Sequence, residues 1–279
     1  MIIMILRKTL FSFFAIYLLQ ACVTTPTKDE MVTLQKQQPA LIAQQKAQLL
    51  PERPQQTDLY FVGFGADYSQ NVFKKEVRYA QNLFDQRFDT KGRSTLLINN
   101  NETDQQLPMA NYRNLKKTLK YVGEKMNAEE DILFLFLTGH GIKGNGLVIN
   151  YGPQQKAVLS PSQLKWALYR AKIKWKVIVV SSCYSGIYVG YLRDKHTLVM
   201  TASNASQPSF GCSSTADFTY FGKAYFKDQL ATDTSFIEAF EQAKIAIAKR
   251  ERGMKFDASK PQIHVEQTMR DKLTELKVN

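Results

Sequence analysis

The chain contains 279 residues, of which 44% are hydrophobic and 22% are charged. This apolar content is enough to bury a large core, which excludes a disordered or fibrous protein and indicates one large folded domain with appendages. The formal net charge is +12, a surplus of bases that favours anionic partners. The sequence has no nucleic-acid-binding module and no zinc-finger spacing, so we expect no nucleic-acid partner.

The first 21 residues have the features of a signal peptide. Arg7 and Lys8 precede the apolar stretch Leu10 to Leu19, which is too short for an ordinary membrane-spanning helix. The sequence LQAC ending at Cys22 resembles the lipobox of bacterial lipoproteins, in which this cysteine is acylated and becomes the first mature residue. The resemblance implies a lipid anchor at Cys22, and Val23 implies export to the outer membrane, facing the periplasm. The alternative is an uncleaved anchor with a chance cysteine.

Residues 22–57 are predicted to form a flexible tether. The segment is rich in Thr, Gln and Pro and has few apolar residues, so we expect at most a transient helix between Met31 and Leu50. We therefore divide the chain into a signal peptide at 1–21, a tether at 22–57 and a folded domain at 58–279. Its last residues, from Gln267 to Asn279, are expected to form a charged tail.

The domain alternates strand and helix patterns, which indicates an α/β fold with a mostly parallel sheet covered on both faces. A short apolar run predicts a strand and an apolar period of 3.6 predicts a helix. The expected strands are Leu59–Phe64, Ser94–Asn99, the apolar parts of Asp131–Gly141 and Lys176–Gly186, Thr197–Ala202 and Gln262–Glu266. The expected helices are Val72–Phe88, Asn111–Val122, one beginning after Ser160, Thr219–Leu230 and Ser235–Lys249, and a hairpin is expected over Gly146–Leu159.

Two of these strands are followed directly by a residue whose side chain can take part in catalysis. The segment DILFLFLTGHG carries His140, and KVIVVSSCYSG carries Cys183. In an open α/β sheet, ligands bind at the carboxyl ends of the strands, where a histidine could activate a cysteine as a nucleophile. Either residue alone is more often structural, because most free cysteines are buried and inert. The two together favour a catalytic pair.

The pattern of strand then His-Gly, and second strand then Cys-x-Ser-Gly, resembles the caspase-like cysteine peptidases of clan CD. It is most similar to the legumain family, peptidase C13, including its bacterial lipoprotein-like members. The resemblance covers about residues 58–266 and extends to the stretches beginning at Thr201, Ser209 and Thr219. It implies a caspase-like three-layer α/β/α sandwich, a peptide or protein substrate and cleavage through an acyl-enzyme.

The resemblance also implies roles for individual residues. Cys183 would attack the peptide carbonyl, the N–H groups of Gly141 and Cys183 would stabilise the oxyanion, and His140 would protonate the leaving amine. Asn71 matches the asparagine that orients the histidine in legumain, although it could equally cap a helix. Asp67 is a second candidate for that orienting role.

The substrate pocket departs from the legumain pattern. The positions of the legumain pocket charges hold Phe73, Ser181 and Lys223 in this chain. We assign Ser203 to the pocket as well. Because none of the three legumain charges is retained, we do not expect a preference for asparagine. We assign no other preference for the substrate side chain.

The rest of the sequence offers few further residues of catalytic or metal-binding type. Cys212 is expected to be a buried free thiol, and no cluster of metal-ligand type occurs, so we expect neither a metal nor another cofactor. Three functions are consistent with these features: an envelope-tethered cysteine endopeptidase, a transpeptidase that uses the same acyl-enzyme, and a catalytically inactive lipoprotein that binds peptides or envelope partners.

Overall fold

A computed structural model describes residues 26–152, 155–213, 215–232 and 235–276 of the chain. The predicted signal peptide and the predicted lipidation site, Cys22, lie outside these residues. Within the described part of the chain, no helix is both long and apolar enough to cross a membrane.

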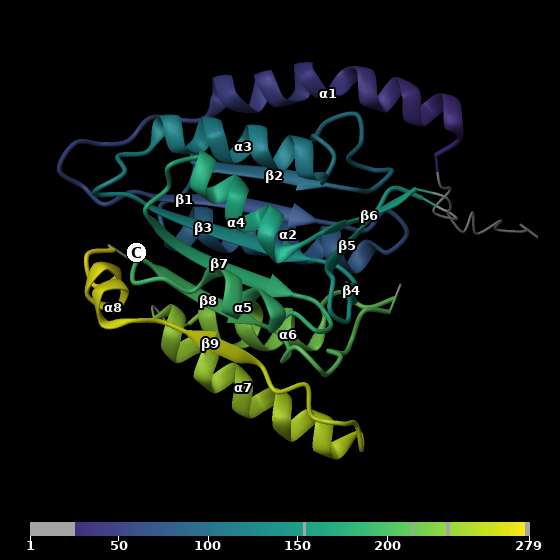
Figure 1. The fold of residues 1–279 in the computed structure, drawn as a ribbon, viewed down its shortest axis with the longest axis vertical. Coiled ribbons are helices and arrows are strands. Elements are labelled where there is room, and N and C mark those ends of the chain that lie inside the picture. The colour runs from purple at the N-terminus through teal and green to yellow at the C-terminus, as the bar shows by residue number, and fades with distance from the viewer. Residues whose placement is uncertain (1–25, 153–154, 214, 233–234, 277–279) are drawn as a thin grey trace, which may run out of the picture.

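The fold is built around a six-stranded sheet (Figure 1). Its strands in spatial order are β2 (Ser94–Ile98), β1 (Leu59–Gly65), β3 (Ile132–Thr138), β7 (Trp175–Ser181), β8 (Thr197–Thr201) and β9 (Gln262–His264). All neighbouring pairs are parallel except β8 with β9, which is antiparallel. The central strands β1, β3 and β7 are almost wholly buried, as expected for strands covered on both faces. The prediction of a mostly parallel sheet is confirmed.

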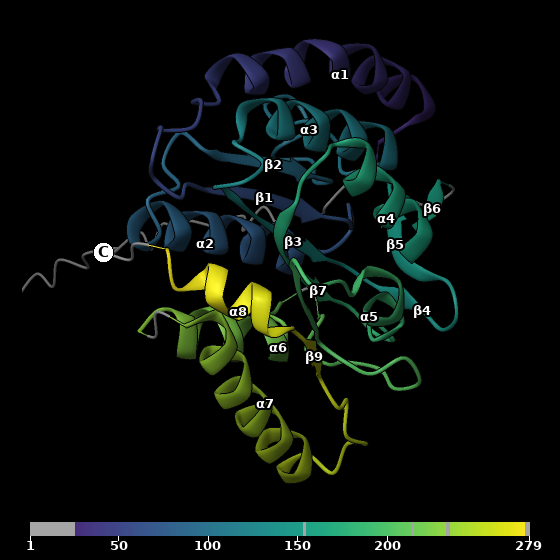
Figure 2. The same ribbon diagram turned by 60° about the vertical axis from the view of Figure 1, so that its left-hand side comes forward.

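Helices cover both faces of this sheet, so the predicted three-layer α/β/α arrangement is also confirmed (Figure 2). One layer contains α1 (Lys28–Gln48), α3 (Tyr112–Lys125), α4 (Pro161–Arg170) and α5 (Ile187–Leu192). The other contains α2 (Asn71–Arg87), α6 (Tyr220–Gly222), the π-helix η1 (Lys223–Leu230) and α7 (Phe236–Gly253). A separate buried cluster of apolar side chains fills the space between the sheet and each layer.

A small second sheet lies beyond the end of β3. It consists of β4 (Gly141–Ile142), β5 (Gly146–Asn150) and β6 (Lys156–Leu159), all antiparallel. The pairing of β5 with β6 confirms the hairpin predicted over Gly146–Leu159. Because β4 begins immediately after His140, this sheet fixes the direction in which the chain leaves the histidine.

The prediction of a flexible tether is wrong from Lys28 onward. Thr27 and Glu30 form a reciprocal capping box that starts α1. The few apolar residues of the segment recur at helical spacing, so they form one stripe that is buried in the core. The buried residues of α1 are Met31, Leu34, Gln38, Leu41 and Ile42. The apolar residues are too few for a coiled coil, but one stripe suffices to pack α1 beside α3.

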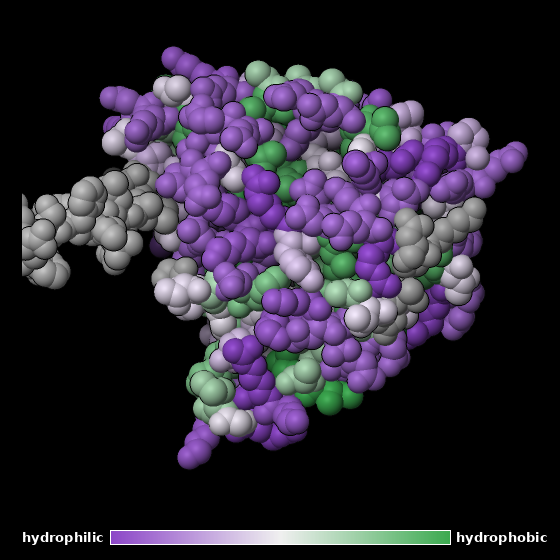
Figure 3. Space-filling model, turned by 180° about the vertical axis from the view of Figure 1, so that it is seen from behind, coloured by the Kyte–Doolittle hydropathy of each residue, from purple (hydrophilic) through white to green (hydrophobic). Residues whose placement is uncertain are grey.

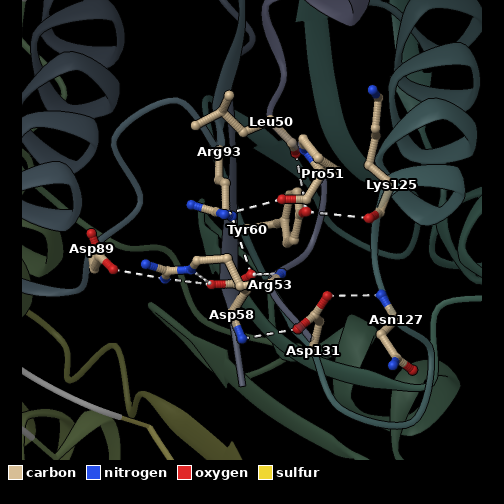
Figure 4. Close-up of polar contacts among 10 residues, drawn as sticks. All are labelled: Leu50, Pro51, Arg53, Asp58, Tyr60, Asp89, Arg93, Lys125, Asn127 and Asp131. Atoms are coloured by element: carbon tan, nitrogen blue, oxygen red, sulfur yellow. Dashed lines mark hydrogen bonds and ion pairs between the residues drawn. The ribbon is translucent and has the colours of Figure 1, made fainter. Parts of the chain in front are cut away.

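The segment between α1 and β1 is held by a buried charge cluster at the amino ends of the strands (Figure 4). The carboxylate of Asp58 is fully buried and pairs with both Arg53 and Arg93. The backbone N–H of Asp58 donates to Asp131, 2.9 Å away. Burial raises the pKa of Asp131 to about 6. Residues 50–58 are therefore an integral part of the domain.

The carboxyl-terminal region contains a second correction. Residues Gln267–Leu273 form α8, and Met269 on this helix is fully buried against the core. The expected charged tail is therefore wrong for this segment, because Met269, together with the partly buried Leu273 and Leu276, packs against the core.

Candidate active site

The register of the central strands brings the two predicted catalytic residues to the same level. Strands β3 and β7 are parallel neighbours, and their last paired residues are Thr138 and Ser181. His140 and Cys183 each lie two residues beyond that pair. The N–H of Gly139 donates to the carbonyl of Ser181 (3.2 Å), so the pairing continues toward both loops. The long apolar runs that form these strands therefore place His140 and Cys183 on neighbouring loops at one edge of the sheet.

The glycines that flank His140 are required by close packing. A Cβ atom on Gly141 would lie 1.9 Å from the carbonyl oxygen of Cys183, and one on Gly139 would lie 2.8 Å from the Cβ of Ala66. No larger residue fits at either position unless the backbone moves. The histidine loop is thus pressed between the loop that carries Cys183 and the loop that follows β1.

The thiol of Cys183 is half-buried and contacts a residue that we had not assigned to the site. The backbone N–H of Ser209 donates to Sγ of Cys183 (3.3 Å), and the thiol lies 3.4 Å from the Ser209 carbonyl oxygen. Tyr184, the residue after Cys183, has a φ of +57°, which is uncommon outside glycine. Cys183 therefore lies at the start of a tight turn and is partly accessible to solvent.

His140 lies beside Asp67, one of its two candidate orienting residues. Nε2 of His140 is 4.0 Å from Oδ2 of Asp67, an ion-pair distance if the imidazole is protonated. The buried Asp67 carboxylate is itself held by the N–H of Ser69 (2.8 Å) and by the amide of Asn150 (3.0 Å). Asp67 is thus positioned to stabilise an imidazolium at His140.

Asn71, the first candidate, has a different partner. Its side-chain oxygen accepts a hydrogen bond from the side-chain amide of Asn100 (2.8 Å). Both Asn71 and His140 are described by the structure, and no hydrogen bond joins them. The alternative interpretation as a helix cap is wrong, because Gln70 occupies the cap position of α2 and makes no side-chain cap bond. The structure brings Asp67 to the imidazole and leaves Asn71 in a neighbouring loop contact.

The four predicted pocket residues have different surroundings. Phe73 is buried and packs edge-on against the His140 ring, with centroids 5.2 Å apart. Ser181 is buried, and its hydroxyl lies 3.4 Å from that of Thr219. Ser203 is also buried and donates to the carbonyl of Ser182. Only Lys223 is substantially exposed, and its ammonium group is paired with Asp228. Three of the four predicted pocket residues are therefore buried, and only Lys223 presents a charged group at the surface.

Glu76 is a buried carboxylate beneath the catalytic loops that we had not singled out from the sequence. It is fully buried on α2, and its oxygens accept hydrogen bonds from the N–H and hydroxyl of Thr219 (both 2.7 Å) and from the hydroxyl of Thr138 (2.8 Å). Burial raises the pKa of Glu76 to about 7, although these hydrogen bonds oppose the shift. Glu76 therefore ties the end of β3 to the turn that begins α6.

Cys212 is a free thiol, but it is half-buried, whereas we predicted a buried one. Burial is the main cause that raises its pKa, and the neighbouring Cys183 is the second. The structure holds no cluster of three or more His, Cys, Asp or Glu side chains suited to a metal ion among its described residues. The site is thus made of Cys183, His140 and Asp67, with Ser209 beside the sulfur.

Comparisons with known proteins agree with this architecture. The Peptidase C13 family model matches residues 124–271, a span that contains both His140 and Cys183. The crystal structure of caspase-1 from Spodoptera frugiperda is similar in fold, with a TM-score of 0.51 and 12% sequence identity over 76% of this chain and 89% of that chain. No protein in the curated set matches the chain in sequence. The fold is therefore caspase-like, and the chain belongs to the peptidase C13 family.

Proposed function

We propose that this protein is a cysteine-type endopeptidase that cleaves peptide bonds through an acyl-enzyme formed on Cys183. One observation carries the proposal: the parallel register of β3 and β7 puts His140 and Cys183 two residues beyond the same pair, on loops in close contact. Membership of the peptidase C13 family supports a peptide or protein substrate.

In the proposed reaction, the Cys183 sulfur attacks the peptide carbonyl while N–H groups of the two loops stabilise the oxyanion. We assign this role to the N–H groups of Gly141 and Cys183. His140 takes the thiol proton as the sulfur attacks and gives it to the leaving amine, whose departure leaves a thioester. Asp67 stabilises the imidazolium that exists between these two proton transfers. Water then attacks the thioester, which releases the acid and returns a proton to the sulfur.

Thiol labelling tests the nucleophile, because Cys212 serves as an internal reference on the same chain. Iodoacetamide should label Cys183 faster than Cys212, and His140→Ala should slow the labelling of Cys183 without changing that of Cys212. In a peptide library, Cys183→Ala and His140→Ala should each lower cleavage at least about a thousandfold. If the two thiols were labelled equally and no cleavage depended on Cys183, the peptidase proposal would be contradicted. The protein would then be a catalytically inactive one that binds peptides.

Product analysis distinguishes hydrolysis from transpeptidation, which would use the same acyl-enzyme. With an added amine such as a glycine peptide, mass spectrometry should detect free carboxyl termini as the main product. A dominant amide product formed with the amine would contradict the hydrolase assignment and identify a transpeptidase.

We further propose that a lipid on Cys22 anchors the protein to the outer membrane, on the periplasmic side. The support is the lipobox-like sequence before Cys22, together with the start of α1 at Lys28. Six residue steps span at most about 20 Å, so the domain would stay close to the bilayer. Metabolic labelling with a fatty-acid analogue should mark the parent protein and not Cys22→Ala. Unchanged labelling of the variant would contradict the proposal.

A further inference from the structure

One outer face of the molecule is strongly basic. Helices α3 and α4 lie side by side in the layer that also contains α1 and α5 (Figures 1 and 2). These two helices carry seven bases and a single acid, Glu124. The exposed bases are Arg113, Lys116, Lys117, Lys120, Lys165 and Arg170. On α3 the exposed bases lie on the side opposite the buried stripe, and on α4 Lys165 and Arg170 both lie outside the buried stripe.

Helix α7, in the other layer, carries a much smaller excess of positive charge than α3 and α4 do. Helix α7 has four bases and three acids along its length, so its charges largely balance. The far side of the molecule is also mainly hydrophilic (Figure 3). Polarity therefore does not distinguish the α3–α4 face, whereas its uncompensated positive charge does.

A cleft of about 710 Å³ opens into this face at the amino ends of the strands, between α4, α5 and Lys120 of α3. Its lining includes the buried apolar side chains Leu168, Ile173 and Leu192. The cleft is also lined by seven bases and one acid: Lys120, Lys165, Arg170, Lys172, Lys174, Lys176 and Arg193, with Asp194. This combination of apolar floor and basic wall suits an anionic group attached to an apolar body.

The bases in the cleft are only partly neutralised. Lys176 is nearly buried, and its ammonium group contacts Asp194 (3.2 Å) and the carbonyl of Lys174 (3.0 Å). Burial lowers the pKa of Lys176, which Asp194 opposes, so a further anion in the cleft would stabilise its charged form. Lys165, Lys172 and Arg193 form no ion pair with any acidic residue that the structure describes.

Exposed aromatic residues border the same face. Trp166 and Tyr169 stack on one another, with centroids 5.7 Å apart, and both are more than half exposed. Tyr191 is also exposed at the wall of the cleft. Tyr and Trp are enriched where a protein meets the headgroup region of a bilayer, because one end of each ring system is apolar and the other polar. A site for a soluble anion alone would not need these exposed rings.

We infer that the α3–α4 face, with its cleft, docks on an anionic lipid bilayer and takes up a lipid phosphate headgroup. Each basic residue near such a surface adds to the attraction, and the aromatic residues enter the headgroup region. The face runs along the helix layer, so docking leaves the carboxyl edge of the sheet, with Cys183, open to solvent. The inference depends on neither peptidase activity nor acylation of Cys22.

Vesicle binding by residues 22–279 carrying Cys22→Ala, which lack both the apolar leader and the lipid, tests this inference. The chain has two tryptophans, so adding Trp175→Phe makes Trp166 the sole emitter. We expect at least about tenfold stronger partitioning onto equimolar phosphatidylcholine and phosphatidylglycerol than onto phosphatidylcholine alone, with a blue shift of Trp166 emission. Lys165→Glu, Arg170→Glu and Lys172→Glu together should abolish both, whereas Lys165→Arg with Lys172→Arg should retain them.

A matched control changes three exposed bases of the opposite layer, with the same change in net charge. Lys249→Glu, Arg252→Glu and Lys255→Glu together should alter partitioning less than about twofold. Equal losses in the two triple variants, or equal binding of the parent to both vesicles, would overturn the inference. It would also be overturned if the α4 triple variant lost binding to inorganic polyphosphate or DNA but kept its binding to vesicles, because the face would then serve a soluble polyanion.

Discussion

The two edges of the central sheet are built from opposite kinds of residue. At the amino edge, the buried carboxylate of Asp58 is surrounded by the guanidinium groups of Arg53 and Arg93 (Figure 4). At the carboxyl edge, glycines and small polar residues surround Cys183 and His140, and the nearest charge to the imidazole is Asp67 at 4.0 Å. At the amino edge, ion pairs hold the charged side chains in place. At the carboxyl edge, the side chains of Cys183 and His140 are partly accessible to solvent.

This difference suggests that the amino edge contributes mainly to stability and the carboxyl edge mainly to activity. A buried ion pair resists the loss of either partner, because the remaining charge would be desolvated and unpaired. A nucleophile and its acid need access and freedom to exchange protons, which such a network would deny them. We therefore expect mutations at the carboxyl edge to change activity more than stability, and mutations at the amino edge to do the reverse.

The largest effect is expected for Gly141→Ala at the carboxyl edge. The new Cβ would lie 1.9 Å from the Cys183 carbonyl, so the two loops must separate. Misplaced reacting groups and a misdirected oxyanion donor should together lower kcat/KM at least about a thousandfold, and the displaced backbone should also lower the melting temperature. Gly190→Ala is the matched control, because a Cβ there meets no atom within 4 Å. Unchanged kcat/KM in Gly141→Ala would show that the two loops need not touch.

At the amino edge, Asp58→Asn should lower the free energy of unfolding by about 3 kcal/mol, because Arg93 would keep a buried charge without its counter-ion. Asp89→Asn is the matched control: Asp89 pairs with the same Arg53, but its side chain is 49% exposed. That change should lower the free energy by less than about 1 kcal/mol. Urea unfolding measures both. Similar losses for the two variants would contradict the role given to burial.

The catalytic edge was predictable from sequence because its signals are local and long. Two runs of buried strand residues end in small residues around His140 and Cys183, and parallel pairing of neighbouring strands then determines their proximity. The choice between Asn71 and Asp67 was not predictable. Both follow β1 within a few residues, and only the packing of the loops decides which one reaches the imidazole.

Two other features carried signals that were outweighed by composition. Thr27 and Glu30 have the spacing of a capping box, but the Gln-rich stretch after them favoured a tether. Glu76 lies three residues after Phe73 and just before Val77, on the buried stripe of α2. A charged residue in a helix normally faces solvent, so its burial became visible only through its partners Thr138 and Thr219.

The smallest effect is expected for Glu76, the one buried carboxylate of the carboxyl edge without a cationic partner among the residues described. Its pKa is about 7 in the fold against an ordinary value of 4.5, so folding favours its protonated form. Its contribution to stability is therefore fully present below pH 4.5 and is lost as the pH rises through 7. At 1.36 kcal/mol per pKa unit, this shift corresponds to a loss of roughly 3 kcal/mol.

Glu76→Gln removes this titration and retains the shape of the side chain. Urea unfolding of both proteins from pH 4.5 to 7.5 should show the stability of the parent falling relative to the variant by that amount. Glu241→Gln on the surface of α7 is the control and should leave the pH dependence of the parent unchanged. Parallel curves for the parent and Glu76→Gln would mean that Glu76 stays ionised across this range. The hydrogen bonds from Thr138 and Thr219 would then outweigh burial, and the carboxyl edge would be held by a fixed charge, as the amino edge is.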